Sequence, residues 1–160
     1  MTAGGAFEER RLLKSSDRRG AARGGRRMDD QAGRCPVVLV AEGYDEARQV
    51  FVRYLERFGF HVEEAATLEQ AVTVVHRSRP EVLLCDLTLS SAGAPTSVAE
   101  LAPPGSGTAM IGLVNLEVAR RPAGLATILV KPFRLRAMLE EVRSALRAAG
   151  RARRASAAIA

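Results

Sequence analysis

Four short runs in the middle of the chain are apolar with almost no polar interruption. They read VVLVA (37–41), EVLLCDL (81–87), AMIGLV (109–114) and LATILV (125–130). A continuous apolar run of this length is typical of a β-strand that is covered on both faces. A further segment, FHVEEA (60–65), alternates poorly but also indicates a short strand. The sequence therefore predicts five strands.

Amphipathic segments follow three of these strands. After the first strand, apolar residues recur at spacings of three and four, which predicts a helix with one buried stripe that ends at Gly59. The stripe consists of Ala47, Val50, Phe51, Tyr54, Leu55 and Phe58. Thr67, followed three residues later by Gln70, fits a capping box for a helix over 68–79. A last helix is predicted after Pro132, because one face collects apolar side chains. That face consists of Leu135, Met138, Leu139, Val142 and Leu146.

Strand and helix alternate along the chain, and this order determines the fold class. A right-handed crossover helix is the usual link between parallel neighbours, so the pattern predicts a doubly wound, flavodoxin-like α/β domain with a five-stranded parallel sheet. Two connections carry little helical signal. Residues 90–108 offer about two turns, around Val98 to Leu101, between Pro and Gly breakers, and residues 115–124 are short. We therefore expect shortened third and fourth helices.

The positive charge of the chain lies at its ends. The formal net charge is +6; residues 1–34 hold nine Arg or Lys and five Asp or Glu, residues 147–160 hold four Arg and no acid, and the remainder holds eleven basic and thirteen acidic residues. We predict a basic flexible tail over 1–34, a folded domain over 35–147 and an Arg/Ala-rich tail over 148–160, beginning as a fraying helix end. Such tails could contact nucleic acid through its phosphates. No aromatic residues alternate with the arginines, so solvated tails are the default interpretation.

The sequence has no feature of a membrane or secreted protein. No apolar run approaches the roughly 20 residues that span a bilayer, and the N-terminus lacks the apolar centre of a secretory signal. We therefore expect a cytoplasmic protein without a membrane partner. The two cysteines, Cys35 and Cys85, have no metal-binding spacing and no reason to pair in that compartment. Both are expected to be small core residues.

Charged residues stand at the ends of three predicted strands. Glu42 follows the first strand, Asp86 ends the third and Lys131 follows the fifth. In a doubly wound sheet the carboxyl ends of the strands form the ligand-binding edge, so these side chains should meet. Two carboxylates and an ammonium could hold Mg²⁺ together with a phosphate, and a carboxylate can attack phosphorus to form an aspartyl phosphate. A structural ion pair between Lys131 and Asp86, or a turn-capping role for Asp86, is the alternative.

On these residues, the sequence resembles the receiver domain of two-component response regulators over residues 36–147. The matching segments are VVLVAEGYDEARQVFVRYLERFGFHVEEAATLEQAV, PEVLLCDLTL and ILVKPF. The resemblance implies that Asp86 accepts a phosphoryl group from a sensor histidine kinase or a phosphotransfer protein. It also implies that Glu42, Asp86 and the backbone carbonyl of Thr88 bind Mg²⁺. Lys131 would contact the phosphoryl oxygens, and the peptide bond after it is often cis in the family.

Three positions depart from the receiver pattern. Gly43 stands where receivers usually have a second acidic residue, so one metal ligand is missing and Mg²⁺ binding should be weak or lost. The Ser or Thr that ends the fourth strand of receivers aligns with Val114, and Asn115 could replace it only if the register shifts by one residue. The aromatic residue three positions before the lysine aligns with Ile128. Both positions that relay phosphorylation are therefore aliphatic.

Three functions are compatible with these observations. The first is a single-domain receiver that accepts a phosphoryl group on Asp86, and the second is a pseudo-receiver that binds a partner regardless of phosphate. The third is a nucleic-acid-associated protein that uses its Arg-rich tails. We expect no enzymatic activity. The glycines at 105 and 107 lack the strand, helix and Lys of a phosphate-binding loop, so they do not indicate nucleotide hydrolysis. No output domain is recognisable after residue 147, so we expect signalling through protein contacts of the last helix and fifth strand.

Overall fold

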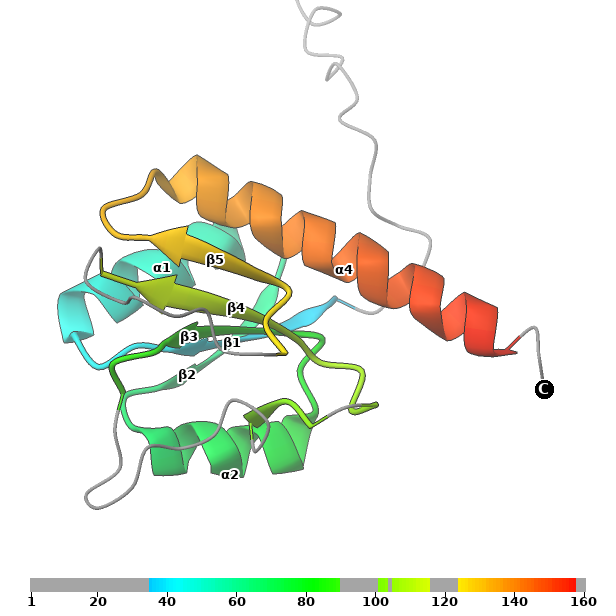
Figure 1. Ribbon diagram of the computed structural model, residues 1–160. Coiled ribbons are helices and arrows are strands. Elements are labelled where there is room, and N and C mark those ends of the chain that lie inside the picture. The colour runs from blue at the N-terminus through cyan, green and yellow to red at the C-terminus, as the bar shows by residue number, and fades with distance from the viewer. Residues whose placement is uncertain (1–34, 90–100, 104, 116–123, 158–160) are drawn as a thin grey trace, which may run out of the picture. The chain divides into compact units, whose positions relative to one another are not determined.

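The computed structural model describes residues 35–89, 101–103, 105–115 and 124–157 (Figure 1). The strands are β1 (Val37–Ala41), β2 (His61–Ala65), β3 (Val82–Asp86), β4 (Ala109–Val114) and β5 (Thr127–Val130). The helices described are α1 (Asp45–Arg57), α2 (Leu68–Ser78) and α4 (Leu135–Ala157). All neighbouring strands are parallel, in the order β2-β1-β3-β4-β5. The predicted doubly wound fold with a five-stranded parallel sheet is confirmed.

The strand order reverses beside β1, which is the feature that positions the site. β2 lies on one side of β1, whereas β3, β4 and β5 follow on the other side. At such a reversal the connections leave on opposite faces of the sheet, and a crevice opens at the carboxyl ends of the strands. The two strands that flank this point, β1 and β3, are buried along their whole length. The ends of these two strands are therefore rigidly held by the core.

The side chains of β1 alternate between two hydrophobic cores. Val38 and Val40 belong to the core beneath α1 and α4, which cover one face of the sheet in Figure 1. Leu39 and Ala41 belong to the core beneath α2 on the other face. Because successive strand residues point to opposite faces, a strand that is covered twice must be apolar throughout. The predicted stripe of α4 is also confirmed. Its buried members are Met138, Leu139 and Val142.

The ends of α1 and α2 follow the local signals in the sequence. Gly59, two residues after α1, has a φ of 84°, a left-handed conformation that favours glycine. Thr67 Oγ1 accepts a hydrogen bond from the Gln70 amide at 3.3 Å. Gln70 Oε1 in turn accepts one from the Ala66 amide at 2.8 Å. The predicted capping box is present, with its return bond made to the residue before the cap.

The remaining expectations have mixed outcomes. α4 runs to Ala157, well beyond the predicted domain end at residue 147. The prediction that both cysteines are buried is wrong for Cys35, which precedes β1 and is exposed, and correct for Cys85. The predicted N-terminal tail and most of the segments assigned to shortened third and fourth helices lie outside the described residues. Within the described part of the chain, no helix is both long and apolar enough to cross a membrane.

Candidate functional site

Three charged side chains from distant parts of the sequence meet at the carboxyl edge of the sheet. Lys131 Nζ lies 2.6 Å from Glu42 Oε2 and 2.7 Å from Asp86 Oδ2. Glu42 and Asp86 are only 2% and 6% exposed. The expected convergence of these residues is therefore observed, with one ammonium bridging two buried carboxylates.

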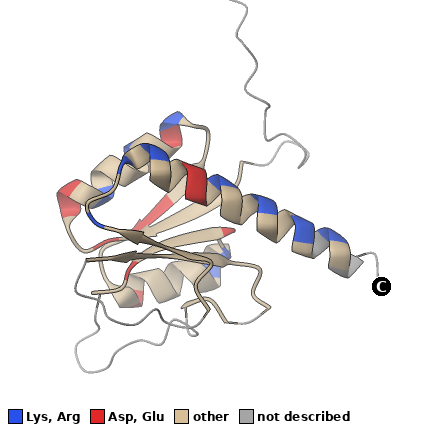
Figure 2. Cartoon of the chain, turned by 45° about the horizontal axis from the view of Figure 1, so that its top comes forward, with Lys and Arg blue, Asp and Glu red and all other residues tan. Residues whose placement is uncertain are grey.

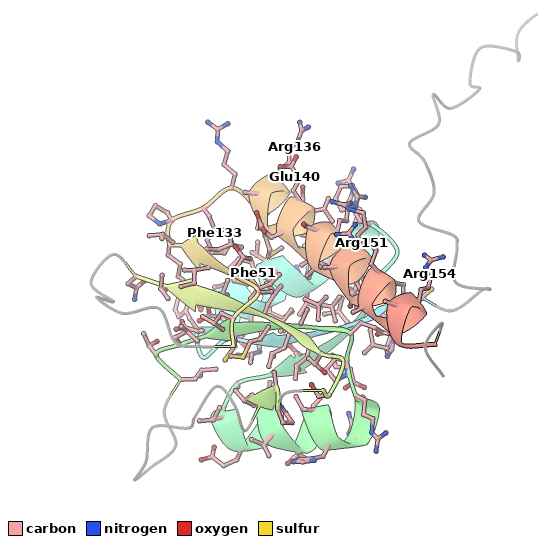
Figure 3. All side chains as sticks on the ribbon, turned by 45° about the vertical axis from the view of Figure 1, so that its right-hand side comes forward. Phe51, Phe133, Arg136, Glu140, Arg151 and Arg154 are labelled. Carbon is pink, nitrogen blue, oxygen red and sulfur yellow. The ribbon has the colours of Figure 1, made fainter. Side chains whose placement is uncertain are left out.

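Backbone and aromatic contacts hold Lys131 in place. Its amide donates to the carbonyl of Val114 at 2.7 Å, which extends the pairing of β5 with β4 by one residue. The peptide bond between Lys131 and Pro132 is cis, as the resemblance implies. Phe133 then stacks on Phe51 of α1, with the ring centroids 5.5 Å apart (Figure 3). The segment that carries the ammonium is thus attached to both the sheet and α1.

Asp86 is oriented by the turn that follows β3. The amide and the hydroxyl of Thr88 both donate to Asp86 Oδ1, each at 2.7 Å. The amide of Leu89 donates to the Asp86 carbonyl at 3.1 Å. Asp side chains commonly organise turns through the amide two residues later, so the spacing Asp-x-Thr carried a signal for this role of Thr88. From the resemblance, only the carbonyl of Thr88 was expected to take part in the site, and its part in metal binding stays a prediction.

Two groups hold Glu42, the Tyr44 amide and the Arg48 guanidinium, and Arg48 was not predicted from the sequence. Glu42 Oε1 accepts from the Tyr44 amide at 3.1 Å. Its backbone carbonyl accepts from Arg48 Nη1 at 2.9 Å. The same guanidinium donates to Glu64 at 3.2 Å and also pairs with Asp45. Because Arg48 connects the start of α1 to β2, no local pattern could identify it; it stabilises the loop from which Glu42 points inward.

The ion pairs shift the pKa values of both partners. Burial alone would raise the pKa of Asp86, but hydrogen bonds from Lys131 and Thr88 outweigh it and hold that pKa below its usual value. Burial likewise opposes the charged form of Lys131, yet hydrogen bonds to Asp86 and Glu42 raise its pKa above the usual value. Burial and the two nearby carboxylates raise the pKa of the Cys85 thiol to about 12. Cys85 is therefore a neutral core residue.

The carboxylate oxygens leave little room for a metal ion. Lys131 takes one oxygen from each carboxylate, Thr88 takes the second oxygen of Asp86, and the Tyr44 amide takes the second oxygen of Glu42. Mg²⁺ requires near-octahedral oxygen coordination and is usually bound by one or two carboxylates together with water and phosphate oxygens. Here an ammonium already occupies the position of a cation between the two acids.

The missing acid at residue 43 reduces the donor set further. In the described residues, no group of three His, Cys, Asp or Glu side chains could hold a metal ion. Gly43 itself could carry a side chain, since an ideal Cβ would lie 3.3 Å from Leu89 Cδ2 and 3.8 Å from the Ala66 carbonyl oxygen. The donor set as it stands fits a divalent cation poorly, and the weak or lost affinity for Mg²⁺ stays a prediction.

The two aliphatic positions lie beside the site. Val114 is the buried last residue of β4, and its carbonyl accepts the Lys131 amide. Asn115 follows the strand and is exposed, and which of these two residues corresponds to the family's hydroxyl residue stays a prediction. Ile128 is half-buried and packs against the core beneath α2. Neither aliphatic side chain can hydrogen-bond a phosphoryl group.

The lowered pKa of Asp86 predicts a specific acid dependence of stability. Its unfolded pKa is about 3.9 and its folded pKa lies lower, so ionised Asp86 stabilises the fold above the unfolded value. This contribution is lost as the pH falls through the folded pKa. In urea unfolding between about pH 6 and pH 2.5, the free-energy difference between wild type and Asp86→Asn should shrink as the pH falls. Parallel curves for the two proteins would contradict the ionised pair.

Comparisons with known proteins identify the architecture. No protein-family model matches the chain, and no curated protein matches it in sequence. Among solved structures, NtrX from Brucella abortus has a TM-score of 0.69 at 15% identity, over 77% of this chain and 30% of NtrX. The receiver domain of an HD domain-containing protein from Pseudomonas fluorescens has a TM-score of 0.66 at 18% identity, over 73% of this chain and 98% of that domain.

A third structure extends the same likeness. A CheY-like response regulator receiver domain from Methanospirillum hungatei has a TM-score of 0.61 at 17% identity, over 74% of this chain and 98% of that one. The chain thus spans under a third of NtrX but nearly all of the isolated receiver domains. At these identities the likeness concerns the fold. This chain has the fold of a response regulator receiver domain.

Proposed function

We propose that this chain is a cytoplasmic receiver-type signalling module without enzymatic activity of its own, in which Asp86 accepts a phosphoryl group. The donor would be a sensor histidine kinase or a phosphotransfer protein. The observation that carries the proposal is the contact of 2.7 Å between Lys131 Nζ and Asp86 Oδ2 at the carboxyl edge of a receiver fold. The contact supports the proposal because a carboxylate that could attack phosphorus lies beside an ammonium that could bind the incoming phosphoryl oxygens.

The chemistry follows from the partners of the two Asp86 oxygens. Oδ1 is fixed by two donors from Thr88, so Oδ2, held only by Lys131, is the oxygen that attacks phosphorus. A new O–P bond forms, and the bond between phosphorus and the donor group breaks. The leaving group, a histidine nitrogen of the donor protein, keeps the electron pair. Lys131 then pairs with the phosphoryl oxygens of the acyl phosphate.

The output of phosphorylation should be a modest change in shape. The Val114 side chain cannot hydrogen-bond a phosphoryl group. The loss of such a bond to a charged group removes about 1.5–3 kcal/mol from the coupling between the phosphoryl group and β4. The signal would pass through contacts of β5 and α4. β5 is an edge strand of the sheet, and its last residue, Val130, is exposed. Its downstream partner would be a protein.

A phosphate-independent interaction module is the second candidate. It is favoured by the fact that Lys131, Thr88 and Tyr44 already occupy every carboxylate oxygen of Glu42 and Asp86. Such a closed ion cluster can serve as a structural element alone. In that case Asp86→Asn would leave partner binding unchanged.

Beryllofluoride, a phosphoryl mimic that binds carboxylates, distinguishes the two candidates. NMR of the full chain should show amide shifts at Thr88 and Lys131 when beryllofluoride is added with Mg²⁺, and Asp86→Asn should show none. Glu69→Gln is the matched control, because Glu69 is an exposed carboxylate on α2, outside the site. Absence of shifts in the wild type would favour the phosphate-independent module.

A further inference from the structure

α4 is longer than the sheet it covers. At about 1.5 Å per residue, its 23 residues span roughly 34 Å, whereas a strand of six residues spans about 20 Å. Figure 1 shows the C-terminal end of α4 projecting past the sheet. The helix therefore presents its last turns away from the candidate phosphorylation site, which lies at the carboxyl ends of the strands.

Arginines follow one face of this helix. Arg143, Arg147, Arg151 and Arg154 are spaced by four, four and three residues. At 100° per residue they fall within a sector of about 80°, so they form one stripe. The guanidinium of Arg143 lies over the ring of Phe58, 5.4 Å from its centroid. The other three are exposed, and we refer to Arg147, Arg151 and Arg154 as the arginine stripe.

The arginine stripe is not neutralised by the described part of the chain. None of its members forms an ion pair with a described carboxylate, in contrast to Arg136, which pairs with Glu140 at 3.0 Å. The acidic residues of α4 are confined to Glu140 and Glu141, and Figure 2 shows only blue charge beyond them. Figure 3 shows Arg136 and Glu140 together near the start of α4 and Arg151 and Arg154 near its other end.

Helix stabilisation does not explain the stripe. Cations near a helix C-terminus interact favourably with the helix dipole, but the effect falls off within the last turn. It can account for Arg154, the only basic residue of the last turn whose side chain is described. It does not account for Arg147 or Arg151. Three guanidinium groups in a row, without a carboxylate partner among the described residues, are positioned for an external polyanion.

The side chains between the arginines indicate which kind of polyanion the arginine stripe can bind. Beyond Leu146 this end of α4 carries no large apolar side chain, only Ala, Gly and Ser beside the arginines. An interfacial membrane helix needs large apolar residues opposite its basic face, so a lipid surface fits poorly. A helix with small side chains is close to the lower limit of about 10–12 Å in diameter. Such a helix fits the major groove of B-form DNA, about 12 Å wide, but not the narrow major groove of RNA.

We propose that the arginine stripe of α4 is a binding surface for the phosphate backbone of double-stranded DNA. The contacts are charge-assisted hydrogen bonds from guanidinium groups to phosphate oxygens, so binding does not depend on base sequence. The surface lies on a different element from Asp86 and does not require its phosphorylation.

Fluorescence anisotropy with a labelled duplex of random sequence tests the proposal on the full chain. At about 0.1 M salt, replacing all three stripe residues by Gln should weaken binding at least tenfold, since each phosphate contact releases about 0.9 counterion. The slope of log K against log salt should become less negative by about 2.7. The N-terminal segment is unchanged in this variant, so its charge cannot produce the difference. Equal affinity and slope in variant and wild type would overturn the proposal.

Four controls separate position, charge, fold and lipid binding. Arg136→Gln removes a side chain that is 83% exposed from the same helix, but one that is already paired, and should leave binding unchanged. Replacing the stripe by Lys keeps the charge and should retain affinity within about threefold; a loss as large as that of the Gln variant would refute phosphate binding. Gln and Arg have similar helix propensity, so circular dichroism should be unaltered. Binding to phosphatidylserine vesicles without binding to the duplex would also overturn the proposal.

Discussion

Replacing Lys131 with Met is expected to lower the free energy of unfolding by about 3 kcal/mol. The ammonium is the common partner of Glu42 Oε2 and Asp86 Oδ2, and its removal leaves two buried like charges that face each other. Methionine keeps most of the side-chain volume, so the loss reflects charge rather than packing. Urea unfolding at pH 7 measures it. Arg136→Met is the matched control, because the exposed pair of Arg136 with Glu140 should contribute under about 0.5 kcal/mol.

The Lys131→Met variant also tests whether the ammonium occupies the position of a divalent cation. With the ammonium gone, two carboxylates face a position that a divalent cation can enter, and binding to the folded state alone raises stability. The stability of Lys131→Met should therefore increase with Mg²⁺ concentration, while that of the wild type should change little. If both proteins respond equally to Mg²⁺, Lys131 does not occupy the cation position.

Restoring an acid at residue 43 is expected to restore metal affinity. Gly43→Asp should increase Mg²⁺ affinity at least tenfold, because an added carboxylate about 4 Å from a cation contributes about 1–4 kcal/mol per unit charge. The backbone can accept the change, since the nearest obstacle to a Cβ is the flexible end of Leu89 at 3.3 Å. Mg²⁺ titration by calorimetry gives the affinities.

Gly43→Asn separates charge from shape in that experiment. Asparagine has nearly the same size as aspartate but no charge, so its Mg²⁺ affinity should stay close to that of the wild type. An equal gain in the Asp and Asn variants would show that side-chain bulk, and not a missing ligand, controls metal binding. No gain in either would mean that Lys131 excludes the ion even when the second acid is present.

The sequence predicted the sheet and the meeting of its charged ends because both depend on simple patterns. β1 is apolar at every position since Val40 and Ala41 face different cores, and this double burial is visible as a continuous run. Glu42, Asp86 and Lys131 each sit at the end of such a run. Parallel strands bring their carboxyl ends to one edge, so the convergence needed no knowledge of side-chain contacts.

The role of Arg48 and the length of α4 could not be predicted, because the first depends on contacts between distant residues and the second on competing helix propensities. Arg48 supports the Glu42 loop from α1, and its partner Glu64 lies on β2, so the interaction has no local pattern. The length of α4 was underestimated because Gly150 and the Arg-rich composition indicated a fraying end. Ala and Arg are strong helix formers, and together they outweigh the cost of about 1 kcal/mol for one glycine. The arginine stripe exists only because that segment is helical.

Intact mass after incubation with acetyl phosphate and Mg²⁺ shows whether Asp86 accepts a phosphoryl group beside Lys131. The wild type should gain one acid-labile phosphoryl group, and so should Glu69→Gln. Asp86→Asn should gain none while unfolding cooperatively like the wild type. Labelling that persists in Asp86→Asn, or a wild type that gains no phosphoryl group from acetyl phosphate or any histidine kinase supplied, would contradict the claim.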